Sequence, residues 1–195
     1  MANNHNSMDE MTKKETAQYA HQRVLDFTFS CDNKASFLLA FIGVVLTVIT
    51  TAEQFTRTFS IIIASLKSYW VENEDMVIDW GKCVTGASAV AFYVLFAIAL
   101  YFLLASLTAN TNSNEQDSLL FFGTIVNGRS SANDYVNAVK SAVTSKSLED
   151  DLLKQTYRCS EICVKKYKNY GKAVRCVKLG VGALLIFIVL SFILF

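Results

Sequence analysis

The feature that most constrains this chain is a set of three long stretches without a charged residue, at 35–52, 83–114 and 179–195. A helix needs about 20 apolar residues to cross roughly 30 Å of hydrocarbon. The middle stretch, whose apolar part ends near Leu107, reaches that length. The outer two reach it when the lysines that precede them, Lys34 and Lys178, extend their ammonium groups towards the bilayer surface. The three stretches therefore predict membrane-spanning helices rather than buried core helices.

The composition favours long helices around these spans. The sequence contains no proline and only eight glycines, and these are the residues that most often interrupt a helix. We therefore expect an all-α membrane protein with three transmembrane helices. The first span follows 34 polar-rich residues and lacks a small-residue cleavage site, so we interpret it as a retained helix and not as a signal peptide.

The distribution of lysine and arginine predicts the topology. Residues 1–34 hold four of them, 53–82 hold three together with five acidic residues, and 109–178 hold eleven. Because cytoplasmic loops are enriched in lysine and arginine, we expect the N-terminus and residues 109–178 in the cytoplasm and the C-terminus at the outer face.

These expectations divide the chain into six segments. They are an N-terminal cytoplasmic helix (1–34), transmembrane helix 1 (35–52), an external loop (53–82), transmembrane helix 2 (83–107), a cytoplasmic helical sensor region (108–178) and transmembrane helix 3 (179–195). Within the loop, residues 53–70 either extend the first helix or lie at the membrane interface, and we favour the extension.

The cytoplasmic pieces carry helical patterns. Apolar residues at helical spacing before the first span predict a helix that continues into it, because nothing breaks the helix at Asn33. Ser131 and Asp134 resemble a capping box and predict a helix over 132–145. Ser147 starts a further helix that should continue into the third span. The two cytoplasmic pieces form a small domain whose core is thin for its size, which favours a homo-oligomer.

The sequence offers little enzyme chemistry. It contains neither G-x-S-x-G nor G-x-x-x-x-G-K. Its only histidines are His5, near the terminus, and His21, which we expect to be solvated on a polar helix side. Cys159 and Cys163 have the i, i+4 spacing of two metal ligands, but no further ligand lies near them in the sequence. We therefore expect no catalytic residue and no metal site.

An anion-binding site has better support. Arg129 precedes the expected 132–145 helix, whose first N–H groups and positive dipole end favour an anion. Phe121 and Phe122 have rings on which a base can stack. From residue types alone, a solvated Arg129 and phenylalanines in the core remain the more common arrangement. The basic run at 165–178 is explained by topology and anionic lipid, whereas Arg158 lies further from the bilayer.

The order of several segments around the spans carries a resemblance. "DNKASFLLAF" stands at the first span, "LLFFGTI" follows the second, and "LEDDLLKQTYRCSEICVKKYKNYGKA" leads into the third. This arrangement resembles the transmembrane effector family of bacterial Pycsar antiphage systems. The resemblance implies an inner-membrane protein whose partner cyclase makes cyclic CMP or cyclic UMP during infection. The effector would sense that nucleotide and damage the membrane, which gives abortive infection.

With this ligand in mind, we assign expected roles to six residues. Arg129, with the following helix start and Arg158, would hold the single phosphate. Phe121 or Phe122 would stack on the base, and Asn133 or Asp134 would contact its Watson–Crick edge. An acidic acceptor suits the amino group of cytosine, so cyclic CMP is favoured over cyclic UMP. No other cofactor is expected.

Asp32 and Lys34 stand at the entrance of the first span. Either they are an ordinary membrane edge, or Asp32 pairs with a cation of the 148–178 helix, such as Lys172 or Arg175, and couples ligand binding to the membrane. We favour coupling. Because no span contains a charge, nonselective disruption by oligomers fits better than a selective channel.

Two other functions compete with this one, and a third, an intramembrane enzyme, lacks the polar residues that it would need within the spans. The first is a membrane scaffold or lipid-sensing protein without a nucleotide ligand, whose basic helix binds anionic lipid. The second is a sensor of a cyclic oligonucleotide, which would need more cations than Arg129 supplies.

Overall fold

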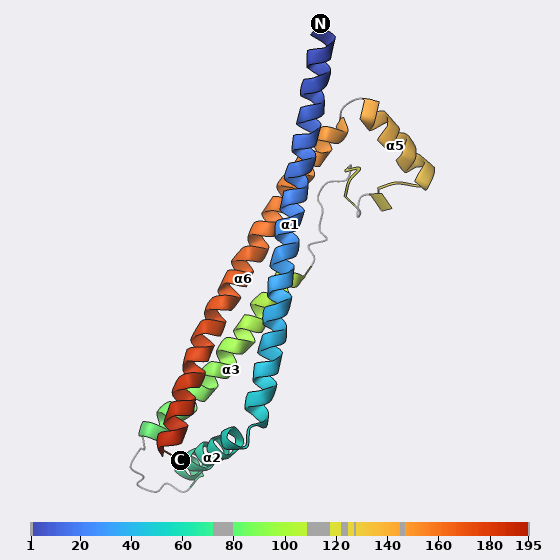
Figure 1. Cartoon of the computed structure of the whole chain (residues 1–195). Coiled ribbons are helices and arrows are strands. Elements are labelled where there is room, and N and C mark those ends of the chain that lie inside the picture. The colour runs from blue at the N-terminus through green and yellow to red at the C-terminus, as the bar shows by residue number, and fades with distance from the viewer. Residues whose placement is uncertain are drawn as a thin grey trace. The chain divides into compact units, whose positions relative to one another are not determined.

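The computed structural model describes residues 2–71, 80–108, 118–121, 125–126, 128–144 and 147–194. Within them lie the helices α1 (Ala2–Thr51), α2 (Glu53–Val71), α3 (Trp80–Leu107), α5 (Ala132–Thr144) and α6 (Ser147–Leu194), drawn in Figure 1. No strand occurs among the described residues. The predicted all-α fold is confirmed.

Three of these helices contain segments long and apolar enough to cross a membrane: Lys13–Thr51, Trp80–Leu107 and Leu148–Leu194. α1 runs without a break past Asn33, and α6 runs without a break past Lys178. Both continuities follow from the absence of proline in the sequence. The three predicted spans are therefore parts of longer helices.

The chain divides into two compact units. Unit 1 comprises Met1–Asn33 and Thr108–Tyr167, and unit 2 comprises Lys34–Leu107 and Lys168–Phe195. Unit 1 takes in most of the two predicted cytoplasmic pieces, 1–34 and 108–178, but residues 168–178 belong to unit 2. The location of unit 1 in the cytoplasm remains a prediction.

Unit 2 holds the apolar core shared by the three spanning helices. Its fully buried members are alanines, phenylalanine rings and two larger aliphatic residues, contributed by α1 (Ala35, Ile42), α3 (Phe92, Phe96, Ala99, Leu103) and α6 (Ala173). Small residues let membrane helices approach closely. α6 approaches α3 closely at Gly180, since a Cβ atom placed there would lie 2.7 Å from two ring carbons of Phe96.

The favoured extension of the first helix into residues 53–70 is wrong. α1 ends at Thr51, Ala52 is not helical, and α2 begins at Glu53 in a new direction (Figure 1). Hydroxyls of Thr47, Thr50 and Thr51 bond to backbone carbonyls of the last turns of α1, and such bonds often bend a helix. The turn lets Phe55 of α2 pack at 5.0 Å from the ring of Phe187 in a second, smaller core.

Candidate functional site

A short segment, Ser118–Phe121, is the hub of unit 1. The hydroxyl of Ser118 accepts bonds from the backbone N–H groups of Leu120 and Phe121, both at 3.2 Å, and so folds the segment into a turn. Ser118 and Leu119 are buried. A serine hydroxyl can form such a turn by bonding to backbone groups two and three residues further on. The turn fixes the backbone of Phe121, whose side chain is half-buried.

The hub is attached to α6 by side-chain hydrogen bonds. Asp151 accepts bonds from the Leu119 N–H at 2.8 Å and from the Ser118 hydroxyl at 3.1 Å. The buried amide of Gln155 donates to the same hydroxyl at 2.9 Å. Buried polar groups that are satisfied in this way favour a single local arrangement. The hub is also attached to α5, because the hydroxyl of Tyr135 donates to the carbonyl of Leu119 at 3.1 Å.

The start of α5 is capped as expected, with one difference. The hydroxyl of Ser131 accepts a bond from the Asp134 N–H at 3.2 Å, which is half of the predicted capping box. The Asp134 carboxylate does not return to Ser131. Its Oδ2 accepts from the N–H and hydroxyl of Ser130, at 3.2 and 3.3 Å. A negative charge at this position stabilises the helix but opposes a bound anion.

Arg129 is half-buried, and Asn133 is exposed. Phe122 lies outside the described residues. Leu119 thus connects three segments that carry predicted ligand residues. Its N–H bonds to α6, which bears Arg158, and its carbonyl bonds to α5, which follows Arg129. Phe121 lies in the same short segment as Leu119 itself.

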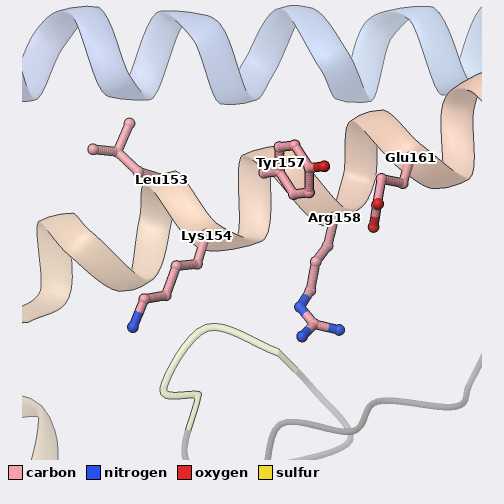
Figure 2. A pocket seen from close by; sticks show the side chains of 5 residues that line it. All are labelled: Leu153, Lys154, Tyr157, Arg158 and Glu161. Carbon is pink, nitrogen blue, oxygen red and sulfur yellow. The ribbon is translucent and has the colours of Figure 1, made fainter.

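Arg158 lines a hollow of about 440 Å³ on α6 together with Leu153, Lys154, Tyr157 and Glu161. Lys154 and Arg158 extend to the same side of the helix (Figure 2), as expected for residues four apart. The side chain of Tyr157 is 68% exposed, as are several other aromatic side chains of the described residues, so most of its ring is open to solvent. The sequence pointed to Arg158 but not to Lys154 or Tyr157, although the spacing of the three residues places them on adjoining turns of a helix.

Unit 1 also contains an ion pair between its two long helices. The ammonium of Lys166 donates to both carboxylate oxygens of Asp32, at 2.6 and 2.8 Å, with side-chain exposures of 11% for Lys166 and 33% for Asp32. Asp32 therefore pairs with the predicted helix, but Lys172 and Arg175 are not its partners. Lys34 is exposed.

The register of the two helices explains which cation pairs with Asp32. α1 and α6 run parallel in unit 1, since His21 bonds to Thr156 and Asp32 bonds to Lys166. Lys172 lies six residues, about 9 Å of helix, beyond that partner. Its ammonium instead stands 5.0 Å from the ring centroid of Phe102.

His21 is not solvated as expected. Its ring is half-buried and lies 3.1 Å from the hydroxyl of Thr156. That hydroxyl donates its one proton to the Leu152 carbonyl at 2.8 Å, so Nδ1 of His21 must donate the bond between them. The imidazole thus acts as a structural link between α1 and α6.

The described cysteines are not arranged to bind a metal ion. Among the described residues, no group of three or more histidine, cysteine, aspartate or glutamate side chains is placed to hold an ion. Burial raises the pKa of the Cys159 thiol above its ordinary value, which disfavours the thiolate that would bind a metal.

Comparison with known proteins assigns the family. The model of the Pycsar effector protein domain matches residues 16–195. The chain is also similar to the Pycsar effector protein GmPycTM of Gulbenkiania mobilis, with 28% identity over 195 residues that cover 95% of each chain. No solved structure matches it.

The family match extends over both units and all three apolar helices. It fits an effector of antiphage defence, in the inner membrane, rather than a catalytic cyclase. This chain belongs to the transmembrane effector family of the Pycsar systems.

Proposed function

We propose that unit 1 senses a cyclic pyrimidine nucleotide and that unit 2 responds by disrupting the inner membrane, so that infected cells stop growing. The observation that carries the proposal is the hub at Leu119. It joins three pieces of chain that bear candidate ligand groups, namely the segment of Phe121, the start of α5 and the face of α6 that bears Arg158. Groups held on separate elements can change their spacing when a ligand binds between them.

Cyclic CMP remains favoured over cyclic UMP. The two bonds from Ser130 use one oxygen of Asp134, and a carboxylate has about four acceptor positions. Asp134 or the adjacent Asn133 can therefore still accept a bond from a cytosine amino group, whereas uracil presents a carbonyl there.

The proposed output is nonselective damage by oligomers. The three spans, at 35–52, 83–107 and 179–195, contain no charge, so they offer no ring of charged side chains for ion selection. The N-terminus and unit 1 would face the cytoplasm, where the nucleotide is made, and the C-terminus would lie at the outer face.

The ion pair between Asp32 and Lys166 is our candidate for coupling. It links α1 and α6 just before both helices pass from unit 1 into unit 2. A ligand that changes the preferred spacing of these helices in unit 1 would act on helices that continue into the spans.

Growth of bacteria carrying the chain tests this proposal. We would express it with an inducible cyclase that makes cyclic CMP, with one that makes cyclic UMP, and with an inactive cyclase. Growth arrest with one active cyclase alone is the expected result. Normal growth with both active cyclases, in cells that contain the protein, would reject the proposal in favour of a scaffold or lipid-sensing role.

A further inference from the structure

The hollow on α6 combines three chemical features in one place. Lys154 and Arg158 supply two positive charges on one side of the helix, and Tyr157 supplies an exposed ring between them in sequence. Glu161 also lines the hollow and brings one negative charge, so two positive charges and one negative charge leave the lining residues net positive. The hollow measures about 440 Å³, and the described residues that line it all belong to α6.

The start of α5 is a poorer place for a phosphate. The carboxylate of Asp134 already occupies it and bonds to Ser130. A cyclic nucleotide brings one negative charge, which is repelled by that acid. On α6 the same charge meets a guanidinium and an ammonium against the one carboxylate of Glu161, so the balance is positive, and both cations form the stronger, charge-assisted kind of hydrogen bond.

We propose that Lys154 and Arg158 bind the phosphate of the ligand and that the exposed ring of Tyr157 stacks on its base. This inference rests on the proposed function and deepens it. Lys154, rather than Arg129, is the second cation that binds the phosphate together with Arg158. The ligand class is a cyclic nucleoside monophosphate, whose phosphodiester carries one negative charge, because two cations and one carboxylate in the lining match one such phosphate and not the several of a cyclic oligonucleotide.

The position of the hollow along α6 separates it from the lipid surface. Arg158 precedes Lys178, the residue before the predicted third span, by 20 residues, about 30 Å of continuous helix. Anionic lipid headgroups attract basic side chains within about 10 Å. The phosphate that reaches these two cations is therefore a free one.

The same side of α6 carries the attachment of the hub. Asp151, which holds Ser118 and Leu119, lies seven residues or two turns before Arg158. A ligand bound to Arg158 thus lies on the face of α6 that also fixes the segment of Phe121, and occupation of the hollow has a direct route to the rest of unit 1.

Binding to the full-length protein in detergent tests the assignment, with radiolabelled cyclic CMP and cyclic UMP as probes and inorganic phosphate and sodium phosphatidylglycerol vesicles as competitors. The phosphate variant is Lys154→Gln with Arg158→Gln, and the stacking variants are Tyr157→Leu and Tyr157→Phe. Lys165→Gln is the matched control, since it removes an exposed lysine of the same helix outside the hollow.

We expect the double variant to raise Kd at least tenfold, as the loss of charge-assisted bonds should. Tyr157→Leu should raise it about tenfold while Tyr157→Phe keeps it, and Lys165→Gln should leave it unchanged. Phosphate should compete for the wild type and vesicles should not; competition by vesicles would show a lipid site and overturn the assignment.

Two further outcomes separate failure of the phosphate subsite from failure of the proposed function. If the wild type binds a nucleotide and the double variant binds it equally well, the subsite is wrong but the proposed function stands. If the wild type binds neither nucleotide, the proposed function and the subsite both fall. Lys154→Gln alone provides the same comparison should the double variant not fold.

Discussion

Replacing Asp32 by alanine removes both carboxylate oxygens to which the largely buried ammonium of Lys166 donates. Only 11% of the Lys166 side chain is exposed, against 33% for Asp32, and the two N–O distances are 2.6 and 2.8 Å. Breaking a fully buried ion pair costs about 3–5 kcal/mol, whereas an exposed pair contributes about 0–1 kcal/mol. This pair lies between those limits, so we expect Asp32→Ala to lower the free energy of unfolding by about 2 kcal/mol.

Chemical unfolding of the purified protein in detergent measures that loss. Asp26→Ala is the matched control, because Asp26 is exposed on the same helix and bonds only to Gln22 among the partners the structure describes; its cost should stay below about 0.5 kcal/mol. Adding Lys166→Met to Asp32→Ala should recover most of the loss, since no buried charge then remains. Equal stability of Asp32→Ala and the wild type would refute the energetic argument.

The same variant tests coupling. Asp32→Ala should bind nucleotide with nearly the wild-type Kd but should no longer arrest growth when the cyclase is active. Loss of nucleotide binding in a folded variant would make Asp32 a ligand contact instead. Retained growth arrest would show that the ion pair does not transmit the signal.

Three further variants or reactions test the packing of the two units. Gln155→Ala removes one of the three N–H donors to the buried hydroxyl of Ser118, whose bonds from Leu120 and Phe121 remain, and should cost about 1 kcal/mol of unfolding free energy. Gly180→Ala should cost about 1–3 kcal/mol because its Cβ meets a buried ring of α3, whereas Gly182→Ala, with nothing within 4 Å of its Cβ, should be tolerated in the same unfolding assay. Cys159 should react with iodoacetamide more slowly at pH 8 than a cysteine in an unstructured peptide, because burial raises its pKa. Because the pKa of Cys159 is higher in the folded than in the unfolded protein, its stabilising contribution is fully present below the ordinary pKa of a thiol. The free energy of unfolding should therefore fall as the pH rises through the pKa of the folded protein.

Much of the helical architecture could be predicted because it depends on local residue choice. The absence of proline predicted that α1 and α6 continue past Asn33 and Lys178. Ser131 correctly marked the start of α5, since capping involves residues only three positions apart. The break at Ala52 was missed, because threonines near a helix end are compatible with both a bend and a straight helix.

The contacts between distant segments could not be predicted in the same way. Whether Asp32 meets Lys166 or Lys172 depends on the register of two helices that are more than 100 residues apart in the sequence, and a shift of six residues changes the partner. The attachment of the hub by Asp151 and Gln155 is likewise a matter of packing. Pattern alone shows only that both side chains lie on a helix.

We propose that this chain is a ligand-gated disruptor of the inner membrane. The most direct measurement is the membrane potential of bacteria that express it together with an inducible pyrimidine cyclase. We expect depolarisation when both proteins are present and the matching nucleotide is made, and a normal potential with either protein alone. An unchanged potential with both proteins, in cells shown to hold this chain in the inner membrane, would contradict it.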